Sequence, residues 1–232
     1  MHLTISLKQL IYFCILIFVV YGNSPNKIYG GEIGNIERYP YVVSIQYQNY
    51  HVCGGVIISQ LHILTSASCV LAENNIVYGN IEILSGTNDL GKDDRIVYWR
   101  IYEVAYVIIH DRYEPQRNWI NDLAILKLTS PMDLFRFREE ASLVSLKMRR
   151  NGFHLVGWGV HPLTGITSRY LQMLHVRSIP PTACKGSGGS PIMMGRKIVG
   201  IISFISMNPE KPAIYTLAPH YEDWIELIKQ KV

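Results

Sequence analysis

The stretch ACKGSGGSPI, residues 183–192, places three glycines beside a cysteine and a proline within ten positions. Glycine allows tight backbone conformations and close approach of other groups, so this composition suits a loop at a functional site better than a core strand. Taken alone, however, GSGGS is also typical of an ordinary flexible turn. Its meaning therefore depends on the motifs that stand elsewhere in the chain.

Two upstream strings decide that meaning, namely LTSASC at 64–69 and NDLAILKL at 121–128. Together the three strings resemble the framework of the trypsin/chymotrypsin-like serine proteases, which normally read LTAAHC, NDIALLKL and CxGDSGGPL. In that family they supply the general base, the carboxylate that orients it, and the nucleophile with its oxyanion hole. The resemblance covers residues 28–232. It implies an all-β fold of two packed antiparallel β-barrels, the second one shortened, with a C-terminal helix.

The catalytic positions implied by this resemblance are largely substituted. Asp122 matches the triad carboxylate, but Ser68 stands where the family has histidine. A serine hydroxyl cannot accept a proton near neutral pH, so general-base catalysis is expected to be lost. Aligning the glycine-rich loop without gaps from Cys184 puts Gly188 at the position of the nucleophilic serine. The alternative alignment takes Ser187 as the nucleophile and Ser190 as an insertion.

No other residue type in the sequence points to a replacement chemistry. The remaining histidines have no catalytic motif around them, and no His or Cys pair stands at ligand spacing within a recognisable metal site. We therefore expect neither a metal nor a cofactor.

The N-terminus predicts secretion. Lys8 precedes an apolar run over residues 10–20, and small residues follow, as in a signal peptide ending near residue 22. The run is shorter than the roughly 20 residues that a membrane span needs. We expect residues 1–22 to be a signal peptide, 23–27 a short pro-segment, and the mature protein to be extracellular with no membrane span.

A cleavage site is expected between Lys27 and Ile28, because IYGG at 28–31 resembles the IVGG that begins mature members of the family. In active members the new ammonium group pairs with the aspartate just before the catalytic serine. Ser187 occupies that position in the ungapped alignment and carries no charge. Cutting after Lys27 is therefore not expected to activate this chain.

Composition is that of one full-sized globular domain, with 48% hydrophobic and 17% charged residues among 232. The net charge of +4 is too small to indicate a nucleic-acid partner. β-branched and aromatic runs predict strands over 41–48, 51–58 and 62–69. We assign 28–128 mainly to the first barrel and 129–232 mainly to the second barrel and a closing helix, whose apolar face is formed by Tyr221, Trp224, Ile225 and Ile228.

The cysteines are read as disulfide candidates because the chain is expected to be secreted. The resemblance implies a bridge between Cys53 and Cys69. Cys184 lacks its usual partner, which predicts either a free thiol or an intermolecular disulfide.

The second half is shorter than the family pattern. Only 24 residues separate Gly159 from Cys184, where the family fits a helix, a strand and a wall of the specificity pocket. Ile205 and Ala213 stand where the family has glycines, and both add volume where substrate would lie. The pocket remnants implied by the resemblance are Thr182, Ser203, Phe204, Ile205 and Ala213.

These observations favour a secreted serine protease homologue without peptidase activity. Such a protein would act, if at all, as a binding or regulatory partner of another protein, such as a protease substrate or inhibitor. Two alternatives stay open: an active secreted endopeptidase that uses Ser187, and a defective product of a mis-spliced or decayed gene. The missing segment and the unpaired Cys184 are what favour the last of these.

Overall fold

The structure is a computed structural model that describes residues 31–71, 76–92, 98–145, 152–159, 166–176, 188–203 and 215–232. Several predicted features lie outside these residues: the signal peptide, the pro-segment, the Lys27–Ile28 bond, Thr182, Cys184, Ser187, Phe204, Ile205 and Ala213. Among the described residues, no helix has the length and apolar character that crossing a membrane requires.

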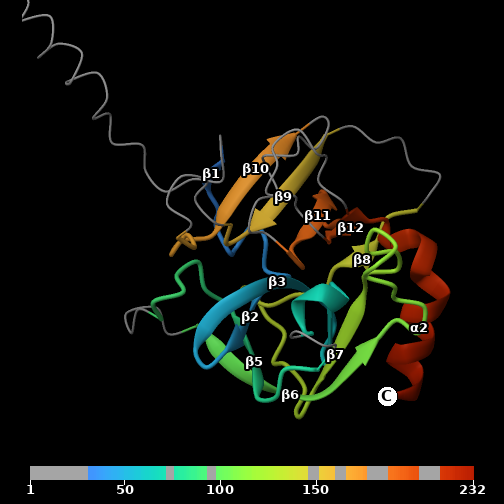
Figure 1. Ribbon diagram of the computed structural model, residues 1–232. Helices are drawn as coiled ribbons and strands as arrows, with labels where there is room; N and C mark the ends of the chain where they lie inside the picture. Colours follow the sequence, from blue (N-terminus) through green and yellow to red (C-terminus); the bar gives the residue numbers. More distant parts are fainter. Residues whose placement is uncertain are drawn as a thin grey trace, which may run out of the picture.

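The first half of the chain forms a closed six-stranded barrel, in the lower part of Figure 1. Its strands pair in the order β2-β3-β4-β7-β6-β5. Closure leaves no strand edge exposed for pairing with other chains. The strands are β2 (Val42–Tyr47), β3 (Tyr50–Ser59), β4 (His62–Thr65), β5 (Ile81–Ser85), β6 (Arg100–Ile109) and β7 (Ala124–Leu128).

Apolar side chains from these strands fill the barrel. Val43, Ile45 and Ile57 are fully buried in one cluster, and alternation along β2 places the first two on the same face. The expected strand over 62–69 is too long, because β4 ends at Thr65 and a short 3₁₀ turn, η1 (Ala67–Cys69), follows. Sequence alternation misses this turn, which is closed by hydrogen bonds from backbone N–H groups to carbonyls three residues earlier.

The second half, joined by the N-terminal strand β1, forms an open sheet within the described residues, paired in the order β1-β10-β9-β11-β12-β13. Short β8 (Ser142–Leu143) runs parallel to β12, which departs from the antiparallel pairing expected throughout. The shortened second barrel thus takes the form of a sheet packed against the first barrel (Figure 1). Its other strands are β1 (Glu32–Ile33), β9 (Phe153–Gly157), β10 (Gln172–Val176), β11 (Pro191–Met194), β12 (Lys197–Ile202) and β13 (Tyr215–Thr216).

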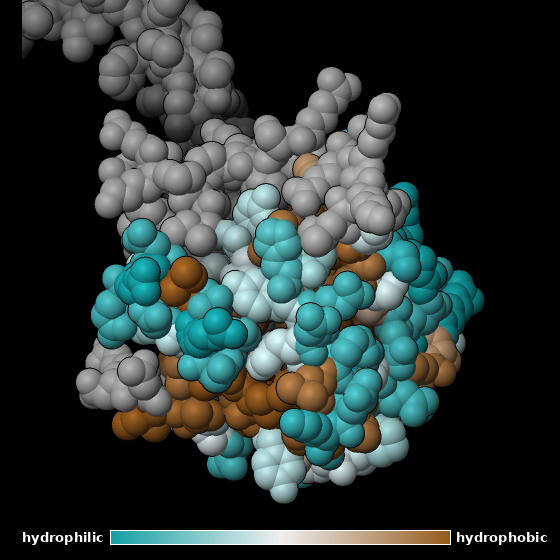
Figure 2. Space-filling model, turned by 90° about the vertical axis from the view of Figure 1, so that its right-hand side faces the viewer, coloured by the Kyte–Doolittle hydropathy of each residue, from teal (hydrophilic) through white to brown (hydrophobic). Residues whose placement is uncertain are grey.

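The predicted closing helix is confirmed as α2 (Glu222–Lys231), which follows the 3₁₀ turn η4 (Ala218–Tyr221). Ile225 is buried in the core, with Trp224 and Ile228 packed against it. Acidic residues in the first turn and lysines in the last complement the helix dipole. Figure 2 shows the face on this side of the molecule, where a hydrophobic band runs across the lower part below a mainly hydrophilic surface.

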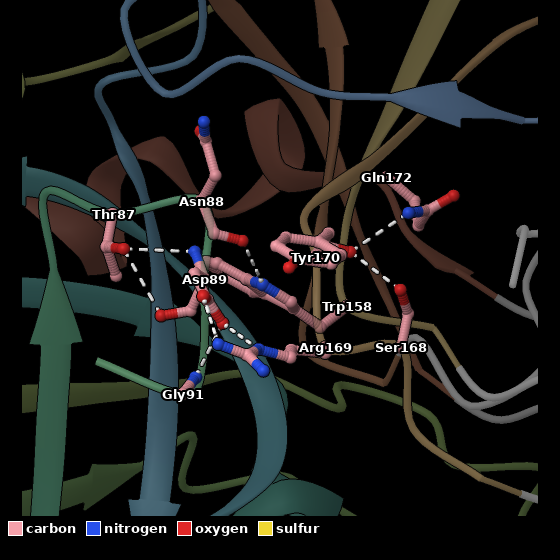
Figure 3. A network of polar contacts seen from close by, with 9 residues as sticks. All are labelled: Thr87, Asn88, Asp89, Gly91, Trp158, Ser168, Arg169, Tyr170 and Gln172. Carbon is pink, nitrogen blue, oxygen red and sulfur yellow. Dashed lines mark hydrogen bonds and ion pairs between the residues drawn. The ribbon is translucent and has the colours of Figure 1, made fainter. Parts of the chain in front are cut away.

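A polar network joins the two halves (Figure 3). Arg169, just before β10, forms a bidentate ion pair with buried Asp89 from the loop after β5, with both N–O distances at 2.7 Å. The carbonyl oxygen of Asn88 accepts from the Trp158 indole at 3.1 Å and from the Leu171 N–H at 2.7 Å. The start of β10 is therefore fastened to the first barrel by several charged and backbone bonds.

Candidate functional site

The retained carboxylate lies at the junction of the two halves. Asp122 lies two residues before the first residue of β7 and is fully buried. Ser68, in the turn η1, faces it and donates twice: its N–H to Oδ1 at 2.7 Å and its hydroxyl to Oδ2 at 2.8 Å. The residue predicted to stand at the histidine position therefore does contact the carboxylate, but as a hydrogen-bond donor.

Ser203, just after β12, completes the enclosure of the carboxylate. It is buried, and its hydroxyl donates to Oδ2 of Asp122. Burial raises the pKa of Asp122, while the hydrogen bonds from Ser203 and Ser68 act in the opposite direction. The prediction from sequence places Ser203 only as a remnant of the substrate pocket. Its contact with Asp122, 81 residues away in the chain, is a long-range feature that no local pattern signals.

We expect Asp122→Asn to be tolerated and to be at least as stable as the parent at neutral pH. The amide oxygen can accept from the Ser68 N–H, and the amide NH₂ can donate to the serine hydroxyls. Because burial raises the folded-state pKa, the stabilising contribution of Asp122 is complete below the ordinary aspartate value of about 3.9 and is lost as pH rises through the raised value. The advantage of Asn should therefore grow from about pH 4 to neutral.

Urea unfolding of both proteins across this pH range measures the effect. Asp223→Asn, on the exposed side of α2, is the matched control and should change little. A loss of more than about 1 kcal/mol in Asp122→Asn at neutral pH would show that the charged carboxylate is needed for the fold.

Gly188 lies against the disulfide at the beginning of the described part of the loop. Its carbonyl oxygen accepts from the Gly54 N–H at 2.9 Å. A Cβ atom built on Gly188 would lie 3.4 Å from the sulfur of Cys69 and 3.5 Å from that of Cys53, which are ordinary contacts. The position thus has room for a side chain, although the residue present offers no nucleophile.

The next two residues, Gly189 and Ser190, pack closely against neighbouring strands. Gly189 has a φ of 71°, and a Cβ there would overlap the Thr65 hydroxyl and the Gly54 carbonyl oxygen. Ser190 is buried, and its hydroxyl has no hydrogen-bond partner among the residues that the structure describes. Its side chain occupies the space left by the missing side chains of Gly54 and Gly157. An unpaired buried hydroxyl costs about 1–3 kcal/mol, a feature that sequence reasoning missed.

The described histidines are engaged away from the carboxylate. His51 bonds the Ser44 hydroxyl at 2.8 Å, and burial lowers its pKa to about 4. His62 bonds the Ser59 hydroxyl at 2.7 Å. His110 packs against the rings of Tyr221 and Trp224. Others, His154, His175 and His220, belong to the second sheet and η4. No imidazole in the described part of the chain bonds Asp122.

The predicted disulfide between Cys53 and Cys69 is present. It joins β3 to the turn that carries Ser68 and so holds that turn beside Asp122. Within the described ranges, no group of three or more His, Cys, Asp or Glu side chains is arranged to hold a metal ion. A pocket of about 320 Å³ between β8 and α2 shares no residue with the Asp122 site.

Comparison with known proteins identifies the family. A family model described as Trypsin matches residues 28–225. The chain is 26% identical to a trypsin of Phaedon cochleariae, covering 87% of this chain and 88% of that protein, and 27% identical to azurocidin of Homo sapiens, covering 88% of each. A solved structure of human heparin binding protein has a TM-score of 0.74 at 23% identity, covering 88% and 97% of the two chains, and supports the fold. With the family model spanning most of its length, this chain belongs to the trypsin family.

Proposed function

We propose that this chain is a secreted member of the trypsin family that has no peptidase activity and acts by binding another protein. The observation that carries the proposal is the Asp122 carboxylate, whose bonds come from Ser68 and Ser203 instead of an imidazole. In the family mechanism the carboxylate orients a histidine that takes the proton of the nucleophile. Without a base in contact with Asp122, that proton has no acceptor.

The loop geometry supports assigning the nucleophile position to Gly188. Gly188 lies beside the disulfide of the turn that carries Ser68, and its backbone bonds to β3. Pro191, two residues after Gly189, already pairs with Ile201 in the β11–β12 ladder. Both alignments keep Pro191 in this place. The Ser190 side chain, however, fits the space beside Gly54 and Gly157, which supports the ungapped alignment, in which Ser190 is not an insertion. Base and nucleophile are then both absent.

The binding role is supported by exposed apolar side chains at the edge of this site. Tyr50 and Val52 are 76% and 39% exposed, and they immediately precede Cys53 of the disulfide. Tyrosine is enriched in the buried centres of protein interfaces, because one large ring supplies both apolar area and a hydroxyl. A protein partner that covers this edge is thus the kind of ligand the surface fits.

Peptide hydrolysis tests the proposal. Purified secreted protein, before and after cleavage behind Lys27, should hydrolyse chromogenic Lys, Arg and aromatic peptide substrates no faster than the buffer blank. An active relative such as a trypsin serves as the positive control. Turnover that appears after cleavage, and that a serine-directed inhibitor stops, would instead establish the active-endopeptidase alternative.

A further inference from the structure

Two histidines face each other on neighbouring strands of the second sheet, β9 and β10. His154 of β9 and His175 of β10 are register partners, and their ring centroids are 4.9 Å apart. Directly opposite partners lie on the same face of a sheet. Met193 of β11 is the other register partner of His154 and is fully buried. The pair therefore lies where the buried face of the sheet ends and solvent begins.

The surroundings of the pair disfavour positive charge. His154 packs against the Tyr39 ring, and its Nδ1 is buried without a hydrogen-bond partner. Burial, His175 and Arg38 together lower the pKa of His154. From β1, the exposed Glu32 lies opposite Met173 and therefore diagonally from His175 on the same face. Among the described residues, no carboxylate forms a hydrogen bond or ion pair with either ring.

The two ends of β10 are supported unequally. At its start, Arg169 is paired with Asp89 (Figure 3). The backbone of Leu171 also forms hydrogen bonds with Asn88 and Gly34. At its end, β1 covers only residues 172 and 173, so residues 174–176 are paired only with β9 among the described strands. Among the described strands, it is therefore the β9 ladder, which carries the histidine pair, that holds this end of β10.

We propose that the His154–His175 pair makes this end of the sheet open in mild acid. Protonation of His154 places a positive charge on a partly buried ring directly opposite the His175 ring, which opposes that charge and so weakens the strand pairing. An open end lets the His154 ring move away from His175 and become hydrated, so a proton binds His154 more readily in the open form. The lowered pKa of His154 sets the direction of the pH effect. The contribution of His154 to stability is complete above the ordinary histidine pKa of about 6.5 and is lost as the pH falls through the lowered pKa.

The opening is expected to be local. The start of β10 is held by the bidentate Asp89–Arg169 ion pair, so separation proceeds from residue 176 towards residue 173. Leu174, packed beneath the sheet with Leu155, would then be exposed. This device does not depend on the proposed loss of catalysis, because the pair shares no residue with the Asp122 site.

Hydrogen exchange measured by mass spectrometry at about pH 5 and about pH 7.5 tests the proposal on the intact secreted protein. After correction for intrinsic exchange rates, protection of residues 174–176 should fall about tenfold or more in acid, relative to β2 and β3. His175→Gln should reduce this loss, because it removes the ring that opposes positive charge on His154, whereas the burial of His154 remains. His220→Gln, at an exposed site on η4, is the matched control and should behave as the parent does.

The comparison with β2 and β3 separates local opening from general acid unfolding, to which buried His51 and His62 also contribute. Unchanged protection of β10 in the parent protein would overturn the proposal. So would an equal loss of protection in His175→Gln, since the effect would then arise elsewhere.

Discussion

Gly189→Ala is expected to destabilise the protein by about 3 kcal/mol or more, enough to prevent accumulation of folded protein from a marginally stable chain. A left-handed backbone costs a non-glycine residue about 1–2 kcal/mol, and Gly189 has a φ of 71°. The added methyl group would also overlap the Thr65 hydroxyl and the Gly54 carbonyl oxygen, in a closely packed region. Yield and urea unfolding of the secreted variant measure the loss.

Gly188→Ala is the matched control, one residue away. Its backbone does not adopt a left-handed conformation, and its new methyl group would make only ordinary contacts with the disulfide sulfurs. We expect a change within about 1 kcal/mol of the parent. The pair of results distinguishes a position that can carry a side chain from one that cannot. If Gly188→Ala were the damaging change and Gly189→Ala the mild one, our assignment of the nucleophile position would be wrong.

Loss of the Cys53–Cys69 disulfide is expected to cost about 3 kcal/mol. The bridge closes a loop with a sequence separation of 16, and a loop of that size restricts the unfolded chain by about this amount. Cys53→Ala combined with Cys69→Ala removes the bridge without leaving a free thiol at either position. Urea unfolding midpoints of the oxidised parent and the double variant measure the difference.

The effect should extend to the Asp122 site, because the bridge anchors the turn in which Ser68 meets the carboxylate. Hydrogen exchange at the Ser68 amide should therefore accelerate in the double variant, more than in β6 on the far side of the barrel. A stability change below about 1 kcal/mol would mean that the barrel holds this turn without the covalent link.

Much of this fold was predictable because its signals are local. Runs of β-branched residues indicated β2 and β3, and the helical face around Ile225 indicated α2. The matching strings assign Ser68 and Asp122 to neighbouring positions of one framework, and the two residues are in contact in the structure. The disulfide was implied in the same way and is present.

The features that sequence did not predict depend on distant parts of the chain. Ser203 meets Asp122 across 81 positions, and the space for Ser190 comes from glycines in two other strands. The parallel pairing of β8 with β12 likewise joins segments about 55 residues apart, for which alternation carries no signal. Whether a buried polar group has a hydrogen-bond partner can be determined only when its neighbours in the fold are known.

The retained carboxylate has a structural part in the fold, whatever its part in chemistry. Asp122 accepts hydrogen bonds from the backbone and hydroxyl of Ser68 and from Ser203, so it still ties η1 and β12 together. Removing every hydrogen-bonding group at this position would leave the hydroxyls of Ser68 and Ser203 without this partner, whereas asparagine, as predicted above, can keep the network. In this account its ancestral role is lost while its role in packing the two halves is kept.

Covalent labelling with a fluorophosphonate probe tests whether any serine of this protein is activated for nucleophilic attack. We expect that none is. Intact mass spectrometry of the secreted protein, with and without cleavage after Lys27, should show no adduct under conditions that label an active trypsin fully. Stoichiometric labelling mapped to Ser187, or to Ser68 beside Asp122, would show an activated nucleophile and contradict the account.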